Sequence, residues 1–352
     1  MEQNKKITII GGGLSGLTLA YLLHTKNISA TILEASSRLG GRIQTVKGEN
    51  GTPLELGATW FSDVHLNLVA LLKRLGLEKF PQYAKGKSLF QTKSFEPPQE
   101  FYIPEAQTPS YRIAGGTQSL IDTLFENIKP EQIKLNRKVV SIKEIDGGLE
   151  VESENGETLT TDKVVLCLPP QLIGSQIEFS PRLPNEISTV LPSVQTWMAG
   201  SIKFVLEYSE PFWRENGYSG MLYSHAGIVT EMYDHTNYEE NKFGFTGFLN
   251  SGTSVYTKAV RKELVLKQLA KLLGNSAATP LAYHEKVWTD EFILSGNQTI
   301  NRPHQNNGHP TFQEPYMNGK LYFSGTETLL EFSGYMEGAV LSAKRTFEKI
   351  IA

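Results

Sequence analysis

The sequence predicts an α/β protein of about two domains, one of which is built on a parallel β-sheet. The chain has 352 residues, more than a single hydrophobic core usually organises. Residues 5–34 have the pattern strand, glycine-rich turn, helix and strand, and this βαβ order is the unit of parallel sheets. Strand-like and helical stretches continue to the C-terminus, so a second, smaller α+β domain is expected.

The first quarter of the chain alternates between strands and helices. Residues 5–10 are rich in β-branched apolar side chains, which suits a buried parallel strand. A helix is expected at 17–24 and a second strand at 30–33. Apolar residues at helical spacing predict another helix at 64–75, which ends at Gly76.

Residues 81–111 differ from their surroundings. Prolines recur through the stretch, at Pro81, Pro97, Pro98, Pro104 and Pro109, with scattered aromatic residues and no sustained period. This pattern favours loops and short strands. We expect the chain to cross between the two domains here.

The remaining elements follow from period and turn signals. A helix is predicted at 119–128 and a β-meander at 138–168, whose turns are marked by residues 146–148 and by the hairpin signal at residues 155–156. Further strands are predicted at 199–208, 221–234, 243–249, 282–288 and 321–324, and further helices at 257–273 and 338–351.

The composition excludes several classes of partner. The formal net charge is -3 and the pI is near 6.2, so neither nucleic acid nor an anionic membrane is an expected partner. Apolar runs stay shorter than a membrane helix requires. The apolar run after Lys6 is broken by three glycines rather than followed by a cleavage site, so a cytoplasmic protein without an export signal is expected.

The cysteine and histidine residues argue against a metal site. The single cysteine, Cys167, excludes an internal disulfide and a cysteine-built zinc site, and it is expected in the core. His304 and His309 share one loop, but a third ligand is missing, so no metal is predicted. His225 and His235 are expected in or beside strands, on the side of a substrate.

A dinucleotide site is predicted at the first strand–helix junction. In Gly11-x-Gly13-x-x-Gly16 the first glycine permits the tight turn, the second lets the backbone approach a pyrophosphate, and the third lets helix and strand pack closely. Helix N-termini bind phosphate through free N–H groups. Glu34 ends the next strand and suits a ribose hydroxyl, so FAD or NAD fits better than NADP. An ordinary glycine turn is the competing interpretation, and this context disfavours it.

Five segments, in order along the chain, resemble the flavin-containing amine oxidases, a family that includes monoamine, polyamine and L-amino-acid oxidases. They are Glu34 to Arg42, Glu55 to Trp60, Gly200 to Phe204 with Glu210 to Trp213, Trp288, and the C-terminal pair Leu321 to Thr328 and Ser333 to Ala339. The resemblance implies a Rossmann-like FAD-binding domain of the glutathione-reductase type, interleaved with the smaller domain.

The resemblance also implies roles for individual residues. Ser15 and Arg42 would contact the pyrophosphate, Val139 the adenine through its backbone, and the helix after Gly334 would direct its N-terminus at the flavin. The full predicted cofactor set is Gly11, Gly13, Ser15, Gly16, Glu34, Ala35, Gly41, Arg42, Ala58, Thr59, Val139, Trp288, Gly325, Thr326, Glu327, Gly334, Tyr335 and Met336.

Three residues are predicted to act on the substrate side. Lys203 matches the family's lysine that holds a water near flavin N5 and helps oxygen react; a solvent-facing edge lysine is the alternative. Tyr335 matches one of the two aromatic rings that flank the amine in monoamine oxidases, and Gln298 stands in place of the other. Phe332 is a candidate apolar wall. Asn297 replaces the cysteine that binds flavin covalently in some members, so non-covalent FAD is predicted.

The chain is short for this family. A long helical insertion that covers the substrate entrance in relatives is replaced here by residues 81–111. The flavin face is therefore expected to be more open, unless a second subunit or a partner covers it. The predicted FAD domain takes residues 1–80, 112–192 and 289–352. The substrate domain takes residues 81–111 and 193–288.

The implied reaction is oxidation of an amine, with hydride transfer from its α-carbon to flavin N5 and release of imine and hydrogen peroxide. Because a fold does not fix a reaction, a flavin-dependent desaturase, dehydrogenase or isomerase is one alternative. A flavin-binding subunit that needs a partner is the other.

Overall fold

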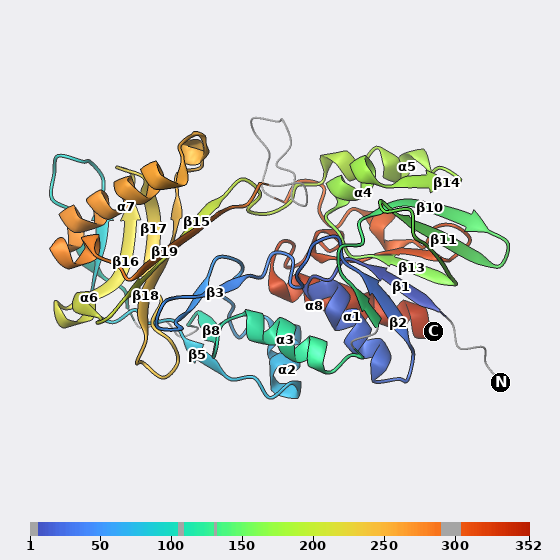
Figure 1. Ribbon diagram of the computed structural model, residues 1–352, viewed down its shortest axis with the longest axis horizontal. Helices are drawn as coiled ribbons and strands as arrows, with labels where there is room; N and C mark the ends of the chain where they lie inside the picture. The colour runs from blue at the N-terminus through green and yellow to red at the C-terminus, as the bar shows by residue number, and fades with distance from the viewer. Residues whose placement is uncertain (1–5, 105–108, 130–131, 290–303) are drawn as a thin grey trace.

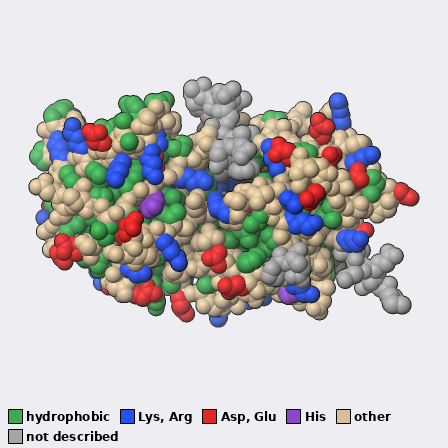
Figure 2. All heavy atoms as spheres, in the orientation of Figure 1, with side chains coloured by type: hydrophobic (Ala, Val, Ile, Leu, Met, Phe, Trp, Pro, Cys, Tyr) green, Lys and Arg blue, Asp and Glu red, His purple; other side chains and the backbone are tan. Residues whose placement is uncertain are grey.

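The computed structural model describes residues 6–104, 109–129, 132–289 and 304–352. The molecule is elongated, with one sheet system at each end and the helices α2 (Leu66–Arg74) and α3 (Gln118–Glu126) between and below them (Figure 1). Within the described ranges, no helix combines the length and the apolar character needed to cross a bilayer. Acidic and basic side chains are interspersed over the face shown in Figure 2.

A five-stranded parallel sheet forms the centre of one end. Its order is β20-β13-β1-β2-β9, with β1 (Ile7–Ile10), β2 (Ala30–Leu33), β9 (Ile133–Lys134), β13 (Lys163–Leu166) and β20 (Leu321–Phe323). Both faces are buried, as the apolar strands predict. Ile9 packs in one core and Ile10 in the other, because successive side chains of a strand point to opposite faces.

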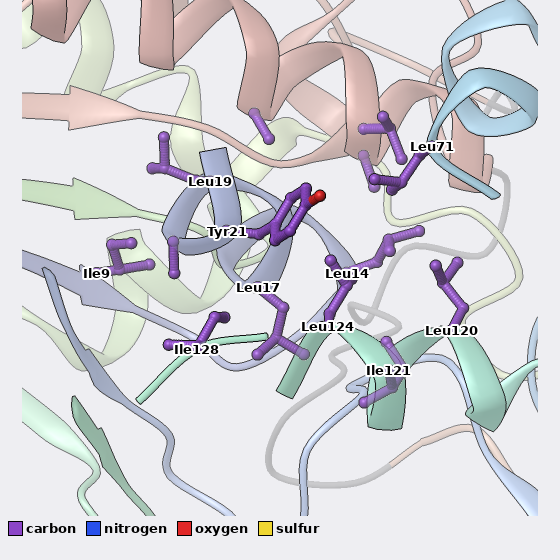
Figure 3. Packing of buried hydrophobic residues seen from close by; sticks show 14 of the residues in the cluster. Ile9, Leu14, Leu17, Leu19, Tyr21, Leu71, Leu120, Ile121, Leu124 and Ile128 are labelled. Carbon is purple, nitrogen blue, oxygen red and sulfur yellow. The ribbon is translucent and has the colours of Figure 1, made fainter. Parts of the chain in front are cut away.

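Each face of this sheet has its own cover. On one face, α1 (Leu14–His24) packs against α8 (Met336–Ile351) and α3, and leucines of α1 fill the core shown in Figure 3. The other face contacts a second sheet of order β12-β11-β10-β14, formed by β10 (Val139–Ile145), β11 (Gly148–Ser153), β12 (Thr158–Thr161) and β14 (Glu178–Ser180). The helices α4 (Pro170–Gln176) and α5 (Asn185–Ser188) flank this second core.

A seven-stranded sheet forms the other end of the molecule. Its order is β19-β15-β18-β17-β16-β6-β7, with β6 (Lys87–Gln91), β7 (Gln99–Tyr102), β15 (Ile202–Tyr208), β16 (Tyr218–Ser224), β17 (Val229–Asp234), β18 (Phe243–Leu249) and β19 (Ala282–Val287). The helix α7 (Lys258–Leu273) covers one face, and α6 (Phe212–Glu215) lies at its edge. The strands of residues 81–111 thus join this sheet.

Two small ribbons connect the ends. The first pairs β3 (Thr45–Lys47) with β4 (Pro53–Glu55), and the second pairs β5 (Lys79–Pro81) with β8 (Tyr111–Ile113). Leu54 and Leu56 pack against Val205 of β15, so β4 reaches the uncovered face of the seven-stranded sheet. This contact positions the site described below.

The structure corrects two details of the sequence prediction and adds one helix. The single strand predicted at 221–234 is two strands, β16 and β17, joined by a turn at Gly227, where φ is +97°. The last strand of the predicted meander, β13, belongs instead to the parallel sheet. Pro170 starts helix α4, because proline is favoured in the first turn of a helix.

Candidate functional site

A cavity of about 330 Å³ lies at the carboxyl ends of the parallel strands, the edge where open α/β sheets bind ligands. It collects predicted residues from the start, the middle and the end of the chain. They are Gly11, Gly13, Ser15, Glu34, Ala35, Gly41, Arg42, Ala58, Val139, Trp288, Gly325, Thr326, Glu327, Gly334, Tyr335 and Met336. The fold therefore brings most of the predicted cofactor-binding residues together in the lining of one cavity.

Four predicted residues are not part of this lining. Gly16 lies behind it, where an added Cβ would stand 2.0 Å from the Gly11 carbonyl oxygen, so its role is close packing of helix on turn. Thr59 and Lys203 are buried next to each other. Gln298 lies outside the described residues, and so does Asn297.

The glycine turn leaves room for a ligand at the start of α1. Gly11 has a φ of +107°, which favours glycine. A Cβ at Gly13 would meet nothing within 4 Å, and Gly13 caps the helix without a side chain. The first N–H groups of α1 therefore face open space, which fits the pyrophosphate of a dinucleotide.

Ser15 and Glu34 are fixed by contacts within the protein. The Ser15 hydroxyl lies 3.0 Å from the Ser324 hydroxyl and 3.2 Å from that of Ser342, so it joins α1 to the end of β20 and to α8. The Glu34 carboxylate accepts hydrogen bonds from the backbone N–H groups of Gly12 (2.6 Å) and Ser36 (2.9 Å). The pyrophosphate contact of Ser15 and the ribose contact of Glu34 remain predictions.

Arg42 has a protein partner that the sequence did not indicate. Its guanidinium meets the Glu327 carboxylate at two points, with N···O distances of 2.5 and 3.1 Å. Both residues line the cavity. The pair joins the second glycine motif to the C-terminal motif, and a pyrophosphate contact of Arg42 remains a prediction.

Trp288 and the N-terminus of α8 form the opposite part of the wall. The indole N–H of Trp288 donates to the Leu56 carbonyl (2.7 Å), and the Lys286 ammonium lies 4.3 Å from the ring centroid. The Thr326 hydroxyl donates to the Tyr335 carbonyl (3.0 Å), which closes the loop before α8. Tyr335 caps α8 without a side-chain bond, so this 16-residue helix also directs free N–H groups at the cavity.

Lys203 is buried, which excludes the solvent-facing edge lysine considered above. It is 2% exposed, and its ammonium donates to the Gly57 carbonyl (2.7 Å) and to the Thr59 hydroxyl. The Trp60 ring centroid lies 4.9 Å away. Burial lowers the pKa of Lys203 to about 7, against an opposing effect of Glu55.

A second cavity of about 360 Å³ adjoins the first at Tyr335, which lines both. It is lined by His65, His304, Leu330, Phe332, Ser333 and Tyr335. Phe332 therefore lines a cavity, and its role as a wall of the substrate site remains a prediction. His304 was expected to be a plain loop histidine, yet its ring stacks on Trp197 with centroids 4.6 Å apart.

The structure extends the prediction for Cys167 and refines that for two histidines. Cys167 packs against the core but also lines the cofactor cavity, because it directly follows β13 at the carboxyl edge of the sheet. The sequence feature that could have placed Cys167 at the cavity is its position directly after a parallel strand. His225 is exposed beside Phe90, whereas His235 is fully buried and contacts Glu55 and Arg112 rather than a cavity.

Comparisons with known proteins place the chain among flavin-containing amine oxidases. Amine oxidase [flavin-containing] B of Sus scrofa is 26% identical over 463 positions, which cover 100% of this 352-residue chain and 87% of the relative. The alignment is longer than the chain, as expected of a short form. The probable flavin-containing monoamine oxidase A of Dictyostelium discoideum is 24% identical and covers 98% of this chain and 97% of the relative.

Solved structures show the same fold. Putrescine oxidase bound to putrescine superposes with a TM-score of 0.85 at 22% identity, covering 99% of both chains. Cyclohexylamine oxidase from Brevibacterium oxydans IH-35A has a TM-score of 0.84 at 21% identity, covering 99% of this chain and 100% of the other. The α/β fold with a Rossmann-like FAD domain is thereby confirmed.

The family comparison covers almost the whole chain. Residues 14–101 and 86–351 match the family described as flavin containing amine oxidoreductase. The open turn at Gly13 and the two helix N-termini suit the FAD that this family carries. The chain therefore belongs to the flavin-containing amine oxidoreductases and is an FAD-dependent oxidoreductase.

Proposed function

We propose that this protein is an amine oxidase. FAD bound in the first cavity would accept a hydride from the carbon that bears the amine nitrogen and pass the electrons to oxygen, so that imine and hydrogen peroxide leave. The observation that carries the proposal is the junction of the two cavities at Tyr335, beside the wall that would hold FAD. Family membership supports the same chemistry.

The residues of this chain would bind and orient the reactants. The N-terminus of α1 would hold the pyrophosphate, and that of α8 would stabilise negative charge on the pyrimidine end of the flavin. Trp288, held by its bond to Leu56, would pack against the ring system. Such fixed donors act without rearrangement during the reaction, which is the main electrostatic contribution of an enzyme.

The second cavity is the proposed amine site. Its wall is aromatic, with the Tyr335 ring 5.9 Å from that of His65 and 6.3 Å from that of His304. Burial lowers the pKa of His65, so this ring is neutral near pH 7. A neutral aromatic wall suits an uncharged amine, the form that can give up a hydride. Gln298 is proposed to contribute from outside the described residues.

Lys203 is proposed to serve the oxygen step. A lysine whose pKa lies near 7 exchanges a proton readily at neutral pH, and the ammonium would orient a water beside the flavin. Its two acceptors, on Gly57 and Thr59, fix the direction of the ammonium. The rings of Trp60 and Phe248 flank the ammonium, with centroids 4.9 and 5.6 Å away.

A second candidate function follows from exposure at the amine site. Tyr335 is 43% exposed and Leu330 is 81% exposed, so the described residues leave the proposed entrance open. We therefore propose that a second copy of the chain or another protein covers it. If that cover is required for turnover, the chain is a flavin-binding subunit.

Anaerobic mixing with a panel of amines tests the proposal. Putrescine, cyclohexylamine and phenethylamine sample charged, alicyclic and aromatic substrates. We expect at least one to bleach the flavin absorbance, and re-aeration to restore it with one hydrogen peroxide formed per flavin reduced. Bleaching by a non-amine donor alone would contradict the amine oxidase. Bleaching only after a partner is added would favour the subunit.

A further inference from the structure

A buried network of charged groups lies beneath Lys203. The two acceptors of the Lys203 ammonium, on Gly57 and Thr59, belong to the segment that directly follows β4. Glu55 is the last residue of β4 and is 2% exposed. The position of the ammonium therefore depends on the groups that hold Glu55.

Glu55 accepts hydrogen bonds from several buried donors. One carboxylate oxygen lies 2.6 Å from Nε2 of His235. The other accepts from the backbone N–H of Thr117 at 2.7 Å and from its hydroxyl at 3.2 Å. The hydroxyl of Thr246, on β18, donates to the Glu55 carbonyl at 3.2 Å. The contacts of His235 and Thr117 favour the ionised carboxylate, and that of Thr246 holds the backbone.

His235 connects this carboxylate to a buried guanidinium. Arg112, on β8, is 3% exposed, and its Nη1 lies 2.8 Å from Nδ1 of His235. Because a guanidinium only donates, Nδ1 must accept, and the neutral ring carries its hydrogen on Nε2, 2.6 Å from the Glu55 carboxylate. The backbone N–H of Glu55 also lies 3.2 Å from Nε2, which with this assignment does not accept its hydrogen. A carboxylate, a neutral imidazole and a guanidinium thus form one chain of hydrogen bonds.

The titration of these groups agrees with that assignment. Burial, and after it the charge of Arg112, lower the pKa of His235 to about 4, so the ring is neutral near pH 7. Burial alone would raise the pKa of Glu55, but His235, Arg112 and Lys203 together hold it at about 2. Burial lowers the pKa of Lys203, Glu55 raises it, and Arg112 lowers it.

We propose that Glu55 and Arg112, joined through His235, are positioning residues that set the charge and the orientation of Lys203. The negative charge of Glu55 favours the protonated form of Lys203, and the positive charge of Arg112 disfavours it. His235, bound to both side chains, fixes the distance between the two charges. The consequence for catalysis rests on the proposed function, in which Lys203 serves the oxygen step. The buried geometry is independent of that function.

Other groups also face Lys203 and must stay in place during a test. Glu231, on β17, raises the pKa of Lys203. Lys286, on β19, stands directly across from Lys203 in the antiparallel pair, and Phe248 stands across from it on β18. The variants below leave all of them unchanged, so any shift reports the network alone.

Substitution of the two charges should shift the pKa of Lys203 in opposite directions. Glu55→Gln removes the attraction between the carboxylate and the ammonium and should lower the pKa of Lys203 by about one unit. Arg112→Gln removes the repulsion between the guanidinium and the ammonium and should raise this pKa. The measurement is an NMR titration of ¹³C-labelled lysine side chains in the FAD-bound protein. The Lys203 resonance is assigned by its loss in Lys203→Met.

His235 offers a matched pair of controls. His235→Gln keeps one donor and one acceptor and should preserve the titration of Lys203. His235→Leu removes the hydrogen bond that fixes the Glu55 carboxylate, so the titration of Lys203 should depart from that of His235→Gln. In each variant the pH profile of flavin reoxidation by oxygen should move with the NMR titration.

An unmoved Lys203 titration in Glu55→Gln and Arg112→Gln, with FAD binding intact, overturns the inference. A network that only supports the fold would lower the melting temperature and leave the titration in place. If a single variant does not fold, Glu55→Gln/Arg112→Gln leaves no charge of the pair unmatched. It should lower the pKa, because Glu55 has the larger effect. If the Lys203 titration shifts as expected but no amine reduces the flavin, the proposed function is contradicted and the inference about the network is not.

Discussion

Arg42 and Glu327 form a two-point ion pair in the wall of the cofactor cavity, with N···O distances of 2.5 and 3.1 Å. The side chain of Glu327 is 1% exposed and that of Arg42 is 30% exposed. Glu327 therefore depends on Arg42 for neutralisation, while Arg42 keeps access to a ligand. One contact thus joins two cofactor segments that are far apart in the chain.

Replacing Arg42 should destabilise the protein and weaken FAD binding together. Arg42→Gln leaves the Glu327 carboxylate buried and unpaired, and we expect a loss of about 2 kcal/mol in the free energy of unfolding, less than for a fully buried pair because Arg42 is partly exposed. Urea unfolding of the apoprotein measures it. The control is Arg42→Gln/Glu327→Gln, which should recover most of the loss. Equal losses in both variants would contradict the pairing.

Alanine at two glycines of the same turn should have separable effects. A Cβ at Gly13 enters open space, so Gly13→Ala should fold normally but weaken FAD binding about tenfold or more, or about 1.4 kcal/mol. A Cβ at Gly16 meets the Gly11 carbonyl at 2.0 Å, so Gly16→Ala should lower stability by about 2–3 kcal/mol. Thermal unfolding and FAD titration distinguish the two. Identical profiles would refute the assignment of separate roles.

Lys203→Met should slow flavin reoxidation more than flavin reduction. Removing a positioned proton donor costs roughly 10²-fold or more in rate, whereas hydride transfer from the amine does not involve Lys203 in the proposed scheme. Stopped-flow absorbance of the two half-reactions measures both rates. Lys143→Met, at an exposed position on β10, controls for the loss of a lysine. An unchanged reoxidation rate would remove Lys203 from the oxygen step.

The flavin should be released by denaturation. The family position that carries a cysteine in covalent members is Asn297 here, and the chain's single cysteine is a poor nucleophile because burial raises the pKa of Cys167 to about 12. Acid precipitation should therefore leave yellow flavin in the supernatant. Colour retained in the pellet would indicate a covalent bond, and Cys167→Ser would show whether that cysteine forms it.

The sequence predicted the parts of the site that depend on local pattern. The turn at Gly11, the helix after it and the strand that ends at Glu34 need only neighbouring residues. The solvent-facing alternative for Lys203 fits the alternation in β15, which puts Lys203 and Glu207 on the face opposite Phe204. All seven of its residues are buried, with α7 on one side and β4 on the other. The resemblance to a family, and not the pattern, indicated that Lys203 points inward.

The charged network beneath Lys203 could not be predicted from the sequence. Glu55, Arg112 and His235 come from three separate parts of the chain, and each alone has the character of a surface residue. Their contacts arise only when the β3–β4 and β5–β8 ribbons close against the seven-stranded sheet. Charged residues that pair only in the tertiary structure do not recur at helix or strand spacing, so the sequence pattern does not indicate the pairing.

Lys203 should make the stability of the protein depend on pH in a defined direction. Burial lowers its pKa from 10.5 to about 7 in the folded state. Between these values the unfolded chain binds a proton that the folded chain does not, so the contribution of Lys203 to stability rises with pH from about 7 to 10.5 and is constant below 7. The free energy of unfolding of the natural protein, minus that of Lys203→Met, should follow this course in urea titrations. A difference that is flat or falls over this range would show that Lys203 keeps its proton when buried.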